Sequence, residues 1–311
     1  MGDVILVVTT FLVATLRMAT PLALAGVGES ISEKSGVLNI GLEAIMLVGA
    51  FCSFIVTFFT GSLMLGLFAG MIGGILVSLV HAFFCISLRV DQTIVGLALN
   101  FTILGLTSFL FLLAFGGADT LPSIPTFSSI PIPVLSQIPV VGPVFFDQNI
   151  IVYITFVSIV LASIAFYRTE WGVRLTAVGE HPQAADTVGI NVFATRYVAC
   201  LLNGFFGGMA GAYFTLARLG FFMENITAGR GFIALVAVIL GRRNPVLIFV
   251  AAMVIGFSEA LQFNLQTIGF PVPSQVFIMF PYIVAVAVLL FSIGKSSNPS
   301  ALGVPYERSK R

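Results

Sequence analysis

The chain has 311 residues, a length that would ordinarily suggest one large or two modest soluble domains. Hydrophobic residues make up 58% of it and charged residues only 9%, whereas soluble proteins carry about 25% charged residues. With a mean hydropathy of +1.10, most of the surface must face lipid, which excludes a soluble enzyme, a disordered chain and a water-exposed nucleic-acid binder.

Long apolar runs predict an all-α polytopic membrane protein with about eight or nine transmembrane segments. A bilayer core about 30 Å thick needs roughly 20 apolar residues per helix. The run 231–240 is too short to cross alone, and a crossing that begins near 219 is interrupted by the polar stretch 227–231. The spans predicted in chain order are 4–25, 37–58, 62–87, 92–115, 149–167, 196–217, 246–263 and 275–293.

The first span has no basic residues before it, so we expect it to be retained rather than cleaved as a signal peptide. Residues 4–16 either cross the membrane or lie along its surface. Cytoplasmic loops of membrane proteins carry an excess of Lys and Arg. The positions of these residues predict that the chain begins outside the cell and ends inside it.

Placing 168–196 in the cytoplasm fixes this alternation. The outer side then holds only Arg218 and Arg230. The loop 116–148 agrees, since it contains no Lys or Arg and six of the 14 prolines, which predicts an extracytoplasmic, turn-rich segment. The basic residues on the inner side are Lys34, Arg89, Arg168, Arg174, Arg196, Arg242, Arg243, Lys295, Arg308, Lys310 and Arg311.

The two halves of the chain have the same order of features: an apolar helix, a Gly-rich polar interruption, a helix and two further helices. The interruptions are 26–36 and 220–231. The halves start on opposite sides of the membrane, which predicts inverted repeats with broken helices. The alternative is that the two apolar sequences are alike by chance.

The predicted divisions are a first transmembrane repeat 1–115, a middle region 116–195 with a linking helix 149–167 and a cytoplasmic coupling loop 168–195, a second repeat 196–293 and a cytoplasmic tail 294–311.

No catalytic or metal-binding pattern is present. His81 and His181 are far apart without metal-ligand spacing, and no G-x-x-x-x-G-K-[ST] motif occurs. We therefore predict that the chain is not an enzyme and binds no cofactor of its own. Uphill transport would then draw on a partner that hydrolyses nucleotide or on an ion gradient.

Polar residues inside apolar runs predict a solute pathway, because a carboxylate such as Glu43 or Glu259 is costly in a membrane unless it has a function. Amides and carboxylates facing a pathway suit a polar, uncharged solute with hydroxyl and ring-nitrogen groups. Most of the phenylalanines are expected to face lipid or to pack, and Phe221 and Phe222 are the best candidates for stacking on a flat ligand. The alternative is that these residues join helices by hydrogen bonds. The candidate pathway residues are Asn39, Glu43, Asn100, Asn203, Phe222, Glu224, Asn225 and Glu259.

The longest inner loop, 169–191, predicts a docking element. Its His181-Pro182 step can open a short helix that ends at Gly189. Ala184, Ala185 and Val188 would then form a small apolar face that can dock into a groove of another protein, whereas a plain solvated loop is the alternative.

Three stretches resemble permeases of ATP-binding cassette (ABC) importers of the ribose and branched-chain amino acid type. The inner loop matches their coupling segment through Gly172, the stretch 174–179, Ala184-Ala185 and the stretch 189–191, and it departs at His181, where the family often has Asn. The stretches EKSGVLNIGLE at 33–43 and GRGFIALVAVILGRRNP at 229–245 are similar to the nucleoside subfamily that works with basic-membrane-protein-type lipoproteins, with Lys34 and Ala44 in place of Arg and Gly.

The resemblance implies an importer subunit of a bacterial or archaeal cytoplasmic membrane. Its expected partners are a cytoplasmic ABC ATPase that uses ATP and Mg, a second permease that is identical or a paralogue, and an extracytoplasmic solute-binding lipoprotein; nucleic acid is not expected. Nucleosides are the implied substrates and simple sugars the alternative, with an ion-coupled carrier and a non-transporting scaffold as rivals. The residues expected to couple to the ATPase are Arg174, Gly179, Glu180, Ala184, Ala185 and Gly189.

Overall fold

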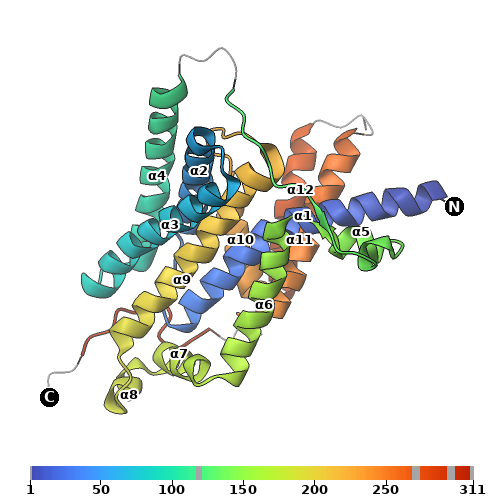
Figure 1. Cartoon of the computed structure of the whole chain (residues 1–311). Coiled ribbons are helices and arrows are strands. Elements are labelled where there is room, and N and C mark those ends of the chain that lie inside the picture. Colours follow the sequence, from blue (N-terminus) through green and yellow to red (C-terminus); the bar gives the residue numbers. More distant parts are fainter. Residues whose placement is uncertain (1, 117–120, 268–273, 293–297, 309–311) are drawn as a thin grey trace.

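The computed structural model describes residues 2–116, 121–267, 274–292 and 298–308, and these are mostly helical (Figure 1). Two π-helical segments, Phe83–Ser87 (η1) and Phe214–Leu219 (η3), extend α3 and α9. The helices are α1 Gly2–Lys34, α2 Leu42–Thr60, α3 Leu63–Ala82, α4 Gln92–Phe115, α5 Val141–Phe145, α6 Ile150–Arg168, α7 Glu170–Glu180, α8 Pro182–Thr187, α9 Val192–Tyr213, α10 Arg230–Leu240, α11 Pro245–Thr267 and α12 Ser274–Ser292.

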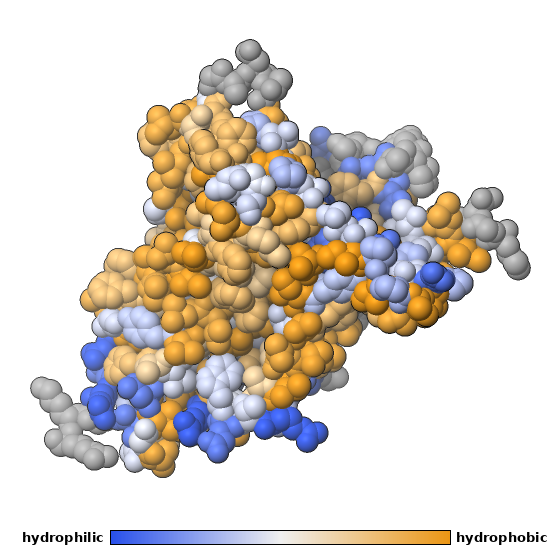
Figure 2. All heavy atoms as spheres, viewed as in Figure 1, coloured by the Kyte–Doolittle hydropathy of each residue, from blue (hydrophilic) through white to orange (hydrophobic). Residues whose placement is uncertain are grey.

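Seven helices within the described residues are long and apolar enough to cross a membrane. They correspond to the first seven predicted spans, and the eighth, 275–293, coincides with α12. Hydrophobic side chains cover the middle of the visible face, while hydrophilic ones gather at the lower end around α7 and α8 (Figure 2). The chain is an all-α polytopic membrane protein, as its composition predicted.

Polar caps set where several spans begin. Asp91, Asn149 and Asn191 accept hydrogen bonds from backbone N–H groups in the first turns of α4, α6 and α9. These bonds satisfy N–H groups that have no partner within a helix. The helices α2 and α10 differ, because their preceding residues are Gly41 and Gly229, which have no side chain for capping.

The first break in the membrane region lies at 35–41, not at 26–36 as predicted. Helix α1 continues through Gly26 and Gly28 to Lys34. These glycines serve close packing: a Cβ added at Gly28 would lie 2.9 Å from the Phe206 Cβ, and one at Gly26 would lie 2.7 Å from a methyl of Ile248. Glycine is tolerated inside a membrane helix where a neighbouring helix approaches closely.

The second break agrees with its prediction. After η3 the chain leaves the helix at Gly220, which has a φ of 73°, and α10 begins at Arg230. The short helix α10 lies near the centre of the bundle (Figure 1). The loop after α4 covers this break, because the Ile124 N–H donates to the Gly220 carbonyl at 2.7 Å.

The loop region between α4 and α6, predicted to be extracytoplasmic, is turn-rich, as its prolines predicted. Within its described part it has a two-residue antiparallel pairing of β1, Ile130–Pro131, with β2, Asp147–Gln148. A 3-10 turn η2, Leu135–Gln137, and the short helix α5 lie between the two strands.

The two halves are interleaved rather than side by side. Helix α3 packs along α9, and α11 packs along α1, so each half supplies a helix to the other. The largest core cluster accordingly combines residues of α1, α2, α9 and α10. This exchange fits the inverted repeat, which stays a prediction.

Small residues allow the closest of these crossings. A Cβ added at Gly208 of α9 would lie 2.4 Å from the Gly70 carbonyl oxygen of α3, and one at Gly74 would lie 2.3 Å from the Gly204 carbonyl oxygen. The backbones of α3 and α9 are therefore in direct contact, as small residues permit between membrane helices.

Replacing Gly208 with alanine is expected to destabilise the fold by about 1–3 kcal/mol, because the new methyl cannot be accommodated between two backbones. Thermal unfolding of the detergent-purified chain measures the effect. Gly105 on α4 is the matched control, since a Cβ there meets no atom within 4 Å and Gly105→Ala should be neutral or stabilising. Equal stability of the two variants would contradict the proposed tight crossing.

Candidate functional site

The N-termini of α2 and α10 meet inside the bundle, and Glu43 joins them. Its Oε1 accepts hydrogen bonds from the Thr227 hydroxyl at 2.5 Å and from the Gly229 N–H at 2.8 Å, and its Oε2 accepts from the Gly231 N–H at 2.6 Å. A carboxylate is favoured there because a helix N-terminus presents free N–H groups and a partial positive charge. Glu43 thus replaces the side-chain cap that Gly229 lacks.

Asn100 plays the equivalent part for α2. Its Oδ1 accepts from the Ala44 N–H at 2.9 Å, and its Nδ2 donates to the Ile40 carbonyl at 3.0 Å. The amide therefore fixes the start of α2 to α4. Both breaks are held by side chains from distant helices, which satisfies backbone groups that lipid cannot.

A hollow of about 230 Å³ lies where these groups meet. Glu43, Asn100 and Asn225 supply its polar wall, and Phe101 and Phe232 lie among its apolar residues. Three of the predicted pathway residues thus share one site. Such a combination of a few convergent polar groups with aromatic and aliphatic side chains is typical of small-molecule sites.

Phe222 and Glu224, the neighbours of Asn225, are placed differently. Phe222 is completely buried and packs its ring against Phe51 and Phe111, at centroid distances of 5.3 and 5.2 Å. It belongs to an aromatic core and does not line the hollow at Glu43, so its stacking on a ligand stays a prediction. Glu224 is exposed.

A second polar cluster surrounds Glu29, which sequence reasoning missed. Its fully buried carboxylate accepts from the Asn39 N–H at 2.9 Å and from the Asn203 Nδ2 at 2.6 Å. One turn later, Glu33 forms a buried ion pair with Arg243, at 2.5 Å between Oε2 and Nε. The i, i+4 spacing of the two acids at the end of a largely apolar helix was the available signal.

Glu259 does not line the hollow at Glu43 and reaches the second break through Arg230. Its carboxylate is 3.5 Å from the Arg230 Nε, and both side chains are largely buried. The Arg230 guanidinium also lies 5.3 Å from the centroid of the Phe214 ring, within range for a cation–π contact. The ion pair connects α11 to the first residue of α10, so it supports the second break from the other side.

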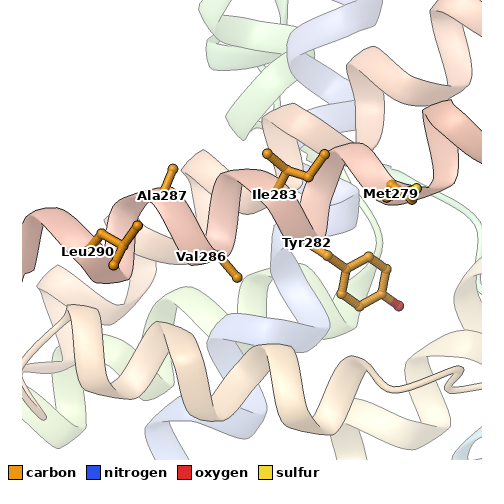
Figure 3. Close-up of a pocket in the computed structure, with 6 residues that line it drawn as sticks. All are labelled: Met279, Tyr282, Ile283, Val286, Ala287 and Leu290. Atoms are coloured by element: carbon orange, nitrogen blue, oxygen red, sulfur yellow. The ribbon is translucent and has the colours of Figure 1, made fainter.

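A larger hollow on the molecule, about 480 Å³, offers no comparable chemistry. Six residues of α12 line it, among them Met279, Ile283 and Val286 (Figure 3). Its one lining hydroxyl, that of Tyr282, donates to the Ala228 carbonyl at 3.3 Å. The wall is otherwise apolar, which suits lipid chains and not a polar solute.

The predicted docking loop forms two helices, α7 and α8. Pro182 opens α8 and Gly189, with a φ of 87°, follows its end, as expected. Helix α7 was not foreseen. A Cβ added at Gly179 would lie 2.1 Å from the Lys34 carbonyl oxygen, so α7 touches the end of α1 directly.

Ala184, Ala185 and Val188 do not form one exposed face. Ala184 is exposed and Val188 is 76% exposed, but Ala185 is buried with Val178 and Tyr306. The outward surface of α8 therefore consists of Ala184 and Val188 without Ala185. Burial, followed by the nearby Asp186 carboxylate, raises the pKa of the Tyr306 phenol above its ordinary value.

The other predicted coupling residues, Arg174, Gly179 and Glu180, lie on α7. Arg174 is exposed and pairs with Glu170 at 3.1 Å, one turn away. Glu180 accepts hydrogen bonds from the backbone N–H and the hydroxyl of Ser300, at 3.1 and 2.9 Å. Among the residues that the structure describes, no group of three His, Cys, Asp or Glu side chains is arranged to hold a metal ion.

Comparison with known proteins adds a family and several relatives. Residues 11–292 match the family model described as the permease component of branched-chain amino acid transport systems. The chain is 38% identical to the guanosine ABC transporter permease protein NupQ of Bacillus subtilis, over 99% of this chain and 100% of that protein. It is 36% identical to the nucleoside ABC transporter permease protein NupC of Lactococcus lactis, over 95% and 96% of the two chains.

Two further relatives bear on the choice of substrate and partner. The putative glucose ABC transporter permease protein TsgC13 of Haloferax volcanii is 35% identical, over 95% of this chain and 96% of that protein. Bacillus subtilis also has a more distant relative, the guanosine ABC transporter permease protein NupP, at 24% identity over 92% of this chain and 84% of that protein.

Proposed function

This chain belongs to the family of permease components of branched-chain amino acid transport systems, and from that premise we propose that it imports nucleosides as the membrane subunit of an ABC transporter. A permease of this kind is a multi-pass membrane protein and not an enzyme. The observation that carries the substrate is the 38% identity, over essentially the whole length of both chains, to a guanosine permease.

The hollow at Glu43, Asn100 and Asn225 is consistent with this substrate. A nucleoside presents a flat apolar ring with amide-like edges, and both kinds of surface occur in the hollow wall. We propose that the solute passes this point, between the two breaks. Sugars are the second candidate, because a relative named as a glucose permease is almost as similar.

The family implies an ATPase and a solute-binding protein as partners. We propose that the ATPase docks on α7 and α8 from the cytoplasm, that the C-terminus lies on the same side and that the binding protein is a lipoprotein. We further propose a paralogous permease as the second membrane subunit, since NupQ and NupP are two guanosine permease proteins of one organism. ATP and Mg would then be used by the partner, and movement of α7 and α8 would rock the helices around the breaks.

Uptake of labelled guanosine by cells or vesicles that contain the complete transporter tests the substrate. We expect this uptake to require ATP and to fall when unlabelled nucleosides compete. Excess ribose or glucose should leave it unchanged. Competition by the sugars would favour the second candidate. An ABC importer would be contradicted altogether if an ionophore abolished uptake and ATP depletion did not.

Replacing Val188 with aspartate is expected to reduce uptake strongly without affecting membrane insertion, because it places a charge on the exposed surface of α8 proposed to meet the ATPase. Co-purification of the ATPase and labelled-nucleoside uptake measure the effect. Val134→Asp is the matched control: Val134 is 75% exposed and Val188 76%, but Val134 lies in the loop between α4 and α5. Normal ATPase binding by Val188→Asp would contradict docking on α8.

A further inference from the structure

The C-terminal segment 298–308 lies near the lower ends of the helices (Figure 1) and contacts several separate parts of the chain. We call it the tail. Its contacts with α7 and α8 are the hydrogen bonds of Ser300 to Glu180 and an ion pair of Arg308 with Asp186 at 3.1 Å. Tyr306 is 5% exposed and packs with Ala185 and with Phe193 of α9.

The same tail holds the first break. The Gly303 N–H donates to the Gly36 carbonyl at 3.1 Å, and two residues earlier the Ala301 N–H donates to the Gly179 carbonyl at 2.9 Å. One short stretch of backbone therefore joins the end of α7 to the break. The fit is tight, because a Cβ added at Gly36 would lie 3.1 Å from the Ala301 carbonyl oxygen and 3.5 Å from the Gly179 Cα.

Arg196, near the start of α9, completes this junction. It is 1% exposed, and its guanidinium donates to the Ser35 carbonyl at 3.2 Å and to the Val304 carbonyl at 3.1 Å. If the tail moved away, this buried guanidinium would keep the Ser35 carbonyl but lose the Val304 carbonyl, and a buried charged donor without its acceptor is costly. The break, α9 and the tail are thus fixed to one another.

Two more contacts extend the tail to other loops. Asn298 accepts from Arg243, the residue that pairs with Glu33, at 2.9 Å. At the other end, Glu307 pairs with Arg89, between η1 and α4, at 2.8 Å. This second pair is exposed and contributes little.

We propose that the tail is a coupling element: it fixes α7 and α8 to the first break, so that displacement of these helices by the ATPase is transmitted to residues 35–41 and to α2. The proposal rests on the proposed function, in which α7 and α8 receive the ATPase. Beyond the break, α2 begins at Leu42 and carries Glu43 in its first turn. From the end of α7, the path to the candidate pathway is therefore short and runs through the backbone hydrogen bonds of Ala301 and Gly303, while α8 is joined to the tail by side chains.

Gly303 offers a variant that loosens the tail and overpacks nothing. Its φ is 77°, and a Cβ there meets no atom within 4 Å. Valine is strongly disfavoured at positive φ, so Gly303→Val should displace the backbone that reaches Gly36. Gly61 is the matched control, because it has a φ of 69°, equally open surroundings and a place in the turn between α2 and α3.

The test uses the complete transporter reconstituted in liposomes, with nucleoside uptake and ATP hydrolysis measured on the same samples. Expressed as nucleoside moved per ATP hydrolysed, the activity of Gly303→Val should fall at least about fivefold, while that of Gly61→Val should stay within about twofold of wild type. A chain that ends at residue 297 should resemble Gly303→Val. An assembled Gly303→Val complex with the wild-type ratio overturns the proposal.

A cysteine pair, Asp186→Cys with Arg308→Cys, tests the same idea by replacing the ion pair between the tail and α8 with a covalent link. If the tail and α8 move together, linking them by oxidation leaves uptake intact. A tail that must release from α8 during transport predicts loss of uptake on oxidation and recovery on reduction, and this outcome overturns the proposal.

Stimulation of ATP hydrolysis by the solute-binding protein separates the two proposals. This readout does not require nucleosides to be the solute. Lost stimulation in Gly303→Val, with stimulation retained in Gly61→Val, supports the tail even if wild type moves no nucleoside, in which case only the substrate proposal fails.

Discussion

Replacing Glu43 with alanine is expected to abolish uptake, which is the largest functional effect we predict for one substitution. Three donors, the Thr227 hydroxyl and the N–H groups of Gly229 and Gly231, would lose their acceptor. A buried donor without a partner costs about 1–3 kcal/mol. Since about 3 kcal/mol corresponds to roughly a hundredfold in an equilibrium, the start of α10 should no longer hold its functional position.

The glutamine variant separates charge from geometry. Glu43→Gln keeps the side-chain length and one carbonyl oxygen, but its NH2 group would face a backbone donor and the charge at the helix N-terminus is lost. We expect an intermediate loss of uptake, measured per inserted transporter. Glu224→Ala is the control, because Glu224 lies in the same break but is exposed. Normal uptake by Glu43→Ala would show that this carboxylate is dispensable for the second break.

The sequence located Glu43 but left its role open between a pathway residue and a helix-joining residue. Its three partners lie 184 to 188 residues away. No local pattern can reveal them, whereas the cost of a carboxylate in an apolar run is visible from neighbouring residues alone. Local apolar length also predicted the spans well, because crossing a bilayer depends on length and composition.

Where the prediction of the fold failed, the cause was a contact between distant segments. Gly26 and Gly28 look like helix breakers, but they lie inside α1 because α9 and α11 approach them closely. Ala185 looks equivalent to Ala184 in the sequence, yet Tyr306, 121 residues later, covers only Ala185. Spacing along a helix shows which residues share a face, and not which face another element covers.

Replacing Arg243 with methionine is expected to cause the largest loss of stability. The Arg243 side chain is 5% exposed and that of Glu33 2%. Removal of one partner of a buried ion pair costs about 3–5 kcal/mol, because the other charge stays buried without compensation. Because Glu29 lies one turn from Glu33, two carboxyl groups would then be close together on α1 without the charge of Arg243. Thermal unfolding of the purified chain in detergent measures the loss.

The double variant Glu33→Met with Arg243→Met shows whether the pair serves stability alone. Replacement of both charges by apolar groups is often neutral or stabilising, so most of the lost stability should return. Arg89→Met is the control, because its pair with Glu307 is exposed and should be worth less than about 1 kcal/mol. A double variant no more stable than Arg243→Met would contradict the ion-pair explanation. A stable double variant that fails to transport would show that the link from α1 to the loop before α11 takes part in the transport cycle.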